Sequence, residues 1–188
     1  WWYHLATGKL ERISFIPAKE ITSVCLDSSG NIWLSVYADG VYGYTSAGDE
    51  FCHLNTGNLL SNDVVLDIKE IDGKLWLATD GGGLNVYDPD TQGMRVISHI
   101  PGNNNSLPVN SFGCLYNDQE KNIWAGSIRG GLIGLKRTYF YTYGDAQLNS
   151  TSGLSYKTVT SLYEDRDHIL WLGTDGDGIN RFDPRTSQ

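Results

Sequence analysis

The segment LWLATDGGGLNVYDP, residues 75–89, decides the fold of this chain because its pattern occurs four times. In every copy an aliphatic residue precedes a tryptophan, a glycine follows seven residues after it, and a large apolar residue follows eleven after it. Alternating apolar residues on both sides of the glycine predict two strands joined in a hairpin, since glycine reaches positive φ at little cost. We therefore interpret the repeated residues as structural. They are Trp33, Trp76, Trp124 and Trp171, with Gly40, Gly83, Gly131 and Gly178.

Two further strands complete each repeat. A linking motif such as Leu60-Ser61-Asn62-Asp63-Val64 opens a first strand, and a fourth strand such as residues 50–54 follows the hairpin. The tryptophans are 43, 48 and 47 residues apart, and four antiparallel strands at such a period are typical of a β-propeller blade. The predicted class is all-β.

The repeats divide the chain into blades. Residues 1–16 supply the end of a preceding blade, residues 21–54, 64–99 and 109–143 form complete blades, and residues 159–183 form an incomplete one. Propellers usually need more blades to close, so we expect a partial arc of a larger, about seven-bladed, ring. The alternative is a small four-bladed ring in which the N-terminal strands complete the last blade. Because both ends fall inside the repeat, we expect a piece of a longer protein.

Composition excludes several classes of function. The chain of 188 residues has a net charge of −8 and offers no continuous basic track, so nucleic acid is not an expected partner. No apolar run approaches the ~18 residues that cross a bilayer. Cys25, Cys52 and Cys114 have no metal-ligand spacing, and we expect Cys25 and Cys114 to be small buried residues. We expect no metal, no cofactor and no catalytic motif.

The pattern resembles the two-component regulator propeller repeat. The resemblance rests on Leu60-Ser61-Asn62-Asp63-Val64, on Leu170-Trp171-Leu172-Gly173-Thr174 and on residues 82–89, and it covers nearly the whole chain. Departures occur at residues 36–39 and at Lys136-Arg137. The resemblance implies the periplasmic sensor domain of a bacterial hybrid two-component histidine kinase that senses glycan fragments. The kinase and the membrane helix would lie elsewhere in the parent protein, so this fragment is expected not to be an enzyme.

The candidate binding residues lie in the loops between second and third strands and between blades, which share one face of a propeller. Carboxylates, amides and aromatic rings suit sugar hydroxyls, although turns favour Asp, Asn and Gly in any case. The candidates are Tyr37, Asp39, Asp80, Arg129, Asp175, Asp177 and Lys157, together with Asn103, Asn104 and Asn105.

These observations lead to two hypotheses about function and one about oligomeric state. The first function is a non-enzymatic module that senses a ligand such as an oligosaccharide and transmits its occupancy by shifting a two-state equilibrium. The second is a propeller enzyme, a lyase or hydrolase, with its active site at the central pore. Because an arc exposes a strand edge at each end, we also expect a homo-oligomer formed through these edges.

Overall fold

The structure is a computed structural model that describes residues 2–4, 6–11, 19–103, 106–135, 140–143 and 153–186. Its described strands form five antiparallel sheets, of which the four larger ones are here called blades 1 to 4. Blade 1 contains β3 (Ile21–Leu26), β4 (Ile32–Val36), β5 (Gly40–Tyr44) and β6 (Glu50–Leu54); blade 2 contains β7 (Val65–Ile71), β8 (Lys74–Thr79), β9 (Leu84–Asp88) and β10 (Gly93–Ile97). Blade 3 contains β11 (Phe112–Asn117), β12 (Ile123–Ser127), β13 (Leu132–Leu135) and β14 (Phe140–Tyr143); blade 4 contains β15 (Val159–Glu164), β16 (Leu170–Thr174) and β17 (Ile179–Phe182). The described residues include no helix, which confirms the all-β prediction.

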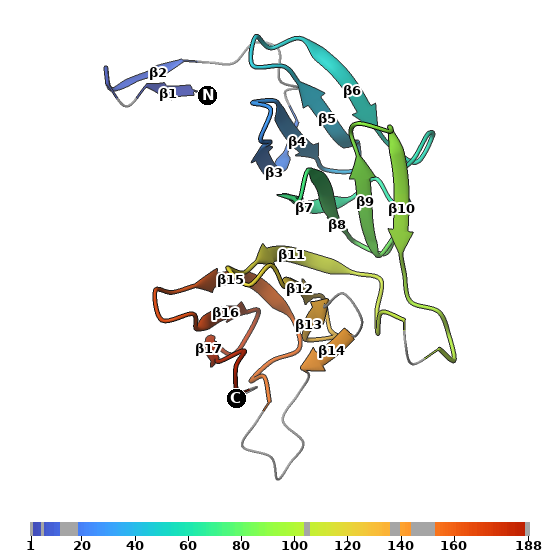
Figure 1. Ribbon diagram of the computed structural model, residues 1–188, viewed down its shortest axis with the longest axis vertical. Helices are drawn as coiled ribbons and strands as arrows, with labels where there is room; N and C mark the ends of the chain where they lie inside the picture. The colour runs from blue at the N-terminus through green and yellow to red at the C-terminus, as the bar shows by residue number, and fades with distance from the viewer. Residues whose placement is uncertain are drawn as a thin grey trace.

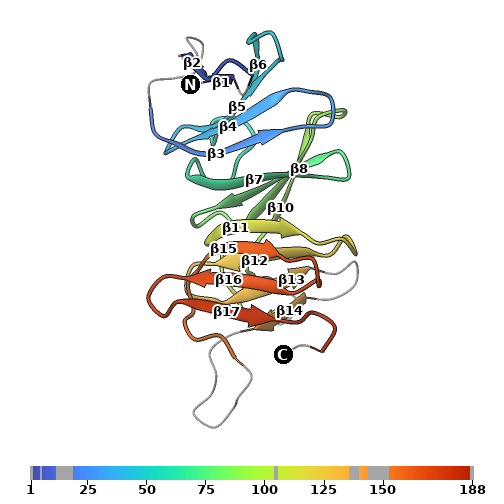
Figure 2. The ribbon, with the colours of Figure 1, turned by 90° about the vertical axis from the view of Figure 1, so that its left-hand side faces the viewer.

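The blades follow one another along an arc. Figure 1 shows β3, β7, β11 and β15 on the concave side, with β6 and β10 on the convex side, and Figure 2 shows the sheets stacked along the long axis. Each first strand has an irregular register at the same place, one residue after its start, as at Val65/Asp67 and Val159/Ser161. A bulge of this kind bends a strand, and its recurrence shows that the four blades share one geometry.

Tryptophans pack each blade against the next. Trp33 lies edge-on to Tyr87 at 5.9 Å between ring centroids, and Trp124 lies edge-on to Phe182 at 5.6 Å. In both cases the partner is the large residue eleven positions after the tryptophan of the following blade. Trp76 packs into the cluster that contains Leu135, which has the same place in blade 3. These contacts bury apolar area between sheets, which is the main stabilisation of such a stack.

The repeated glycines have the backbone that the hairpin requires. Gly40 and Gly83 have φ of +79° and +80°, and a Cβ on them would lie 2.0 Å from the Leu54 carbonyl oxygen and 2.2 Å from the Ile97 carbonyl oxygen. A side chain at either position would therefore collide with the end of the fourth strand. In blade 2 the short turn Asp72-Gly73 has positive φ at both residues, as a type I′ hairpin turn needs.

The N-terminal strands do not complete blade 4. β1 (Trp2–His4) and β2 (Lys9–Glu11) pair with each other in a separate two-stranded sheet, and β17 pairs only with β16 among the described strands. The described residues thus form an open arc of blades and not a closed four-bladed ring. They include no helix that is long and apolar enough to cross a membrane. Cys114 is buried as expected, but Cys25 is only half-buried, because it lies on β3 at the edge of the core between blades 1 and 2.

Candidate functional site

In three of the four blades, one hydroxyl group closes the hairpin turn on the candidate face. Thr79 Oγ1 donates a hydrogen bond to the Gly83 carbonyl oxygen at 2.8 Å, Ser127 Oγ to that of Gly131 at 2.7 Å, and Thr174 Oγ1 to that of Gly178 at 2.9 Å. Blade 1 has Val36 at this position and therefore lacks the hydroxyl group. The residue five positions after the tryptophan has a positive φ in all four turns, namely Ala38 (+54°), Gly81 (+105°), Arg129 (+72°) and Gly176 (+132°). The hydroxyls fix the shape of the turns, so the neighbouring side chains have defined positions.

Backbone hydrogen bonds tie these turns to the loop that enters the next blade. The Gly40 amide donates to Asp63 O at 3.0 Å, the Gly83 amide to Asn110 O at 2.7 Å, and the Gly131 amide to Lys157 O at 2.9 Å. The turns and the entry loops therefore form one connected rim along the arc, which we call the loop rim. It comprises residues 36–40, 60–64, 79–83, 107–111, 127–131, 154–158 and 174–178.

Most candidate residues lie on the loop rim with exposed side chains. Asp80, Arg129, Asp175 and Asp177 come from three blades, and in the described part of the chain their side chains make no hydrogen bond or ion pair. Tyr37 and Lys157 are also exposed. Asn104 and Asn105 lie outside the described residues. The side chains of Asp80, Arg129, Asp175 and Asp177 are available to a ligand, but the structure does not gather them into one cluster.

A polar cluster forms around Asp39 in blade 1. Its carboxylate accepts hydrogen bonds from Lys19 and from the Tyr42 hydroxyl at 3.0 Å, and His53 Nε2 lies 2.8 Å from its carbonyl oxygen. The rings of Tyr42 and His53 stack with centroids 3.9 Å apart. Lys19 holds the pKa of Asp39 below its usual value, whereas burial and then Asp39 raise the pKa of Tyr42 to about 12. Asp39 is thus already paired, unlike the other acidic candidates.

An aromatic residue that the sequence reasoning did not select also lies on the loop rim. The Tyr156 side chain is 45% exposed, and its ring atoms lie 3.4 Å from where a Cβ on Gly176 would be. Gly176 separates Asp175 from Asp177, so the ring lies against the turn that carries these two exposed residues. An exposed ring can stack on a sugar while carboxylates on the same turn bind its hydroxyls. An aromatic residue in the linking motif is the signal that could have identified it.

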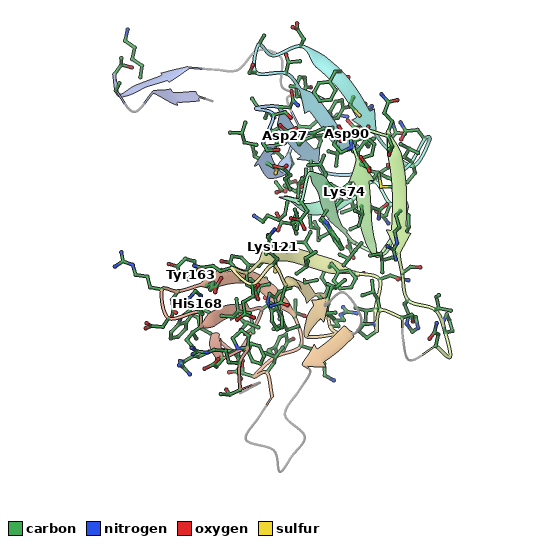
Figure 3. All side chains as sticks on the ribbon, in the orientation of Figure 1. Asp27, Lys74, Asp90, Lys121, Tyr163 and His168 are labelled. Carbon is green, nitrogen blue, oxygen red and sulfur yellow. The ribbon has the colours of Figure 1, made fainter. Side chains whose placement is uncertain are left out.

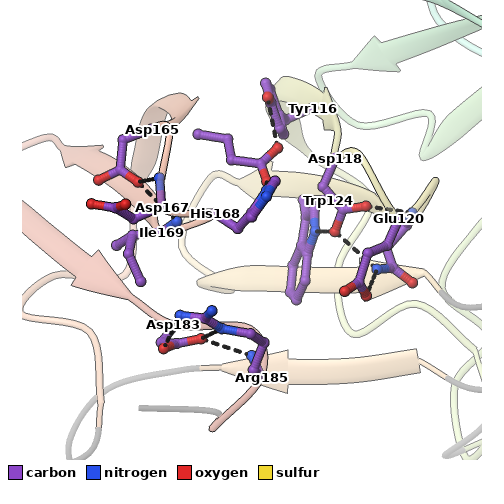
Figure 4. Close-up of polar contacts among 12 residues, drawn as sticks. Tyr116, Asp118, Glu120, Trp124, Asp165, Asp167, His168, Ile169, Asp183 and Arg185 are labelled. Atoms are coloured by element: carbon purple, nitrogen blue, oxygen red, sulfur yellow. Dashed lines mark hydrogen bonds and ion pairs between the residues drawn. The ribbon is translucent and has the colours of Figure 1, made fainter.

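On the opposite face, an aspartate in the first turn binds the tryptophan six residues later. Trp33 Nε1 donates a hydrogen bond to the Asp27 carboxylate at 2.8 Å. Trp124 Nε1 donates to Asp118 at 2.8 Å, and Trp171 Nε1 donates to Asp165 at 2.6 Å. Figure 4 shows the Asp118–Trp124 bond, with Asp165 and its turn nearby. The shorter turn of blade 2 places no aspartate at the corresponding position. These carboxylates have a structural role.

The same face carries a link between blades 3 and 4. The Tyr116 hydroxyl donates to Glu164 at 3.0 Å, and His168 Nδ1 lies 2.8 Å from the same carboxylate (Figure 4). Among the described residues, no group of three or more His, Cys, Asp and Glu side chains is placed to hold a metal ion. The acidic turns of this face therefore bind tryptophan, tyrosine and histidine side chains of the protein itself.

The packed four-stranded sheets define the chain as part of a β-propeller. Residues 106–129 and 153–176 match the family model of the two-component regulator propeller, so blades 3 and 4 carry two-component regulator propeller repeats. Comparison with curated proteins finds no match.

Solved structures share the fold. The chain is 21% identical to the extracellular domain of the hybrid two-component system BT4673 from B. thetaiotaomicron, with a TM-score of 0.73 over 90% of this chain and 24% of that one. It is 19% identical to the extracellular domain of the hybrid two-component system BT3049 from the same organism, with a TM-score of 0.56 over 95% of this chain and 28% of that one. Virginiamycin B lyase from Staphylococcus aureus is 13% identical, with a TM-score of 0.60 over 89% of this chain and 57% of the lyase. The chain spans about a quarter of the two extracellular domains, and these likenesses show the fold.

Proposed function

We propose that this chain is a ligand-sensing part of the extracytoplasmic propeller region of a hybrid two-component sensor histidine kinase. The observation that carries the proposal is the match of residues 106–129 and 153–176, in blades 3 and 4, to the two-component regulator propeller model. The same four-stranded sheet topology is present in blades 1 and 2. The likeness in fold to extracellular domains of hybrid two-component systems supports it. In this function the chain binds and does not catalyse, and a kinase elsewhere in the parent protein carries the signal across the membrane from the periplasm.

The ligand class that fits the loop rim best is an oligosaccharide. Exposed carboxylates at Asp80, Asp175 and Asp177 can accept hydrogen bonds from hydroxyl groups, and Arg129 can donate them. Tyr37 and Tyr156 add exposed rings that can cover the apolar face of a sugar. A long ligand suits these groups, because they are spread along the arc and not gathered in one pocket.

Titration calorimetry of the chain against a panel of neutral and acidic oligosaccharides tests this function. We expect at least one member of the panel to bind. We expect Tyr156→Ala and Asp175→Asn each to weaken binding about tenfold, which corresponds to the free energy of one or two lost hydrogen bonds or ring contacts. The matched control is Asp90→Asn, since Asp90 is exposed on a third-to-fourth-strand turn of the opposite face (Figure 3). Binding that is unchanged in both rim variants would reject the loop rim as the site.

The propeller enzyme is the second candidate, and the likeness in fold to a lyase is the observation that favours it. It predicts that Asp80→Asn or Asp175→Asn abolishes turnover of a glycan or ester while the melting temperature stays the same. Turnover of a panel member without stable binding would replace the sensor hypothesis with this one.

A further inference from the structure

The hairpin turn of blade 3 places an arginine where the blades on both sides have glycine. Arg129 follows its tryptophan by five residues, as Gly81 and Gly176 do in blades 2 and 4, and its φ is +72°. Left-handed backbone of this kind strains a residue that carries a Cβ, whereas glycine adopts it freely. Strain that the equivalent turns avoid indicates that the Arg129 side chain has a role of its own.

Hydrogen bonds fix the turn that carries Arg129. The Ile128 amide donates to Ser111 O at 2.9 Å, and the Gly130 amide donates to Ser127 Oγ at 2.9 Å. The Arg129 side chain is exposed, and it makes no hydrogen bond or ion pair with the residues that the structure describes. A fixed turn reduces the freedom that binding must remove, so the Arg129 guanidinium is presented to a ligand from a defined backbone.

A second basic residue lies at the same junction between blades. Lys157 is exposed in the entry loop of blade 4, and its carbonyl oxygen accepts a hydrogen bond from the Gly131 amide at 2.9 Å. This bond joins the segment that carries Lys157 to the turn that carries Arg129. We call Arg129 and Lys157 the basic pair.

The other two junctions between the described blades have the same backbone but no basic pair. Where the blade 3–4 junction has Arg129 and Lys157, the blade 1–2 junction has Ala38 and Asp63, and the blade 2–3 junction has Gly81 and Asn110. Asp63 and Asn110 also accept the amide of the repeat glycine through their carbonyl oxygens, at 3.0 and 2.7 Å. A common scaffold therefore carries basic side chains at one of these three places, which indicates a local chemical role.

The basic pair lies in an acidic setting. The net charge of the chain is −8, and the exposed charged residues in the rim turns of blades 2 and 4 are Asp80, Asp175 and Asp177. Salt screens charges that lie more than about 8–10 Å apart, so an anion would bind here through direct contacts and not through the overall field. A guanidinium binds carboxylate-type oxygens through paired hydrogen bonds, and an ammonium adds a compact charge.

We propose that Arg129 and Lys157 form a subsite for the acidic group of a saccharide, a uronate carboxylate or a sulfate. Arg129 binds the anionic oxygens, and Lys157 adds a second positive charge from the next blade. Tyr156 precedes Lys157 and is exposed, so its ring can stack on a sugar of the same ligand. This inference rests on the proposed function, because it names the class of saccharide that the loop rim senses.

Calorimetry with charged saccharides and their uncharged counterparts tests the subsite. The probes are trigalacturonate with its methyl ester, and lactose sulfate with lactose, so the two pairs distinguish a carboxylate from a sulfate. We expect the original chain to bind at least one charged probe about tenfold or more tightly than its counterpart. Arg129→Gln should remove this preference and leave the binding of the uncharged probe unchanged. The matched control is Arg95→Gln, since Arg95 is exposed on β10 outside the loop rim, and it should keep the preference.

A second variant separates binding from folding. Arg129→Gly introduces the residue found in blades 2 and 4, and glycine adopts a φ of +72° without strain. We expect this variant to lose the preference for the charged probe while its urea midpoint stays the same or rises. A lower midpoint would assign Arg129 to stability and would overturn the proposal.

The remaining results distinguish this inference from the proposed function. Equal binding of charged and uncharged probes, or a charge preference that Arg129→Gln retains, would overturn the subsite and leave the ligand-sensing function in place. Absence of binding to every probe and to every member of the oligosaccharide panel would reject the proposed function, and this inference with it.

Discussion

Single aspartates stabilise the blades through the indole groups they bind. Burial alone would raise the pKa of Asp27, but hydrogen bonds from Trp33 and Asn31 outweigh it and hold the pKa below its usual value. A carboxyl group whose pKa is lowered by folding stabilises the protein above its unfolded pKa of about 3.9, and this stabilisation is lost as the pH falls further. The Asp27 contribution should therefore be complete at pH 7, begin to fall near pH 4, and be lost as the pH falls through the lowered pKa of the folded protein.

The Asp27→Asn variant tests this at the residue scale. We expect it to be less stable than the original chain at pH 7 and to lose less stability on acidification. Urea midpoints between pH 7 and pH 2.5 measure the difference. Identical pH profiles for the two proteins would show that the Asp27–Trp33 bond has no energetic role.

Glycines at equivalent positions should differ in their tolerance of a side chain. Gly83→Ala combines the cost of positive φ, about 1–2 kcal/mol, with a collision against Ile97 O, so we expect a loss of at least about 3 kcal/mol. The alanine side chain of Gly178→Ala would meet no atom within 4 Å, so this variant should lose only the cost of the positive φ, about 1–2 kcal/mol of stability. Denaturant titration of both variants measures these losses, and equal losses would contradict the account of β17 as an edge strand.

The sequence pattern predicted the strands and hairpins well, but it predicted few of the side-chain contacts. The spacing of tryptophan and glycine was enough for the hairpins, because both residue types are required by the backbone and the core at fixed offsets. The hydrogen bonds that Asp27, Asp118 and Asp165 accept from the tryptophans were not predicted, since turns favour aspartate with or without a partner. The candidate Asp39 was chosen as an exposed ligand group, but its pairing with Lys19 comes from two segments that only the fold brings together.

At the scale of the strands, a serine–asparagine pair explains the linking motif. Asn85 is buried; its Nδ2 donates to Ser61 Oγ at 2.6 Å, and its Oδ1 accepts from the Ser61 amide at 3.0 Å. Ser155 and Asn180 repeat both bonds in blade 4. Blade 3 has Pro108 and Ile133 at these positions, so the donor and its acceptor are absent together.

A double-mutant cycle tests whether the two solutions are interchangeable. Ser61→Pro should cost about 1–3 kcal/mol, because it leaves the buried Asn85 amide without its partner. Adding Asn85→Ile should recover most of that loss, since the pair then matches blade 3. Unfolding free energies of the four proteins give the coupling, and strictly additive effects would contradict the interpretation.

At the scale of the whole molecule, the division into blades could be anticipated from the repeat, whereas the difference between the last blade and the others could not. Blade 4 has the same tryptophan and glycine as the rest, and only exposure distinguishes Trp171 and Ile179 from their counterparts. Tyr156 was missed for a similar reason, because its proximity to Gly176 depends on how the entry loop meets the turn.

Self-association through the strand edge is a further prediction. β17 is an edge strand among the described residues, and such strands pair with other chains. We expect weak association at high concentration that Arg181→Pro reduces, because proline in β17 removes a donor from the edge. Sedimentation velocity over a range of concentrations measures it, and a monomer at every concentration would contradict the prediction.

Hydrogen exchange of the dilute, monomeric chain tests the central claim, an open arc of blades, most directly. β9 is paired on both sides, so its amides should be strongly protected, whereas the β17 amides that point away from β16 should exchange close to the rate of an unpaired strand. Equal protection of β9 and β17 would mean that another strand covers the edge, and it would contradict the arc.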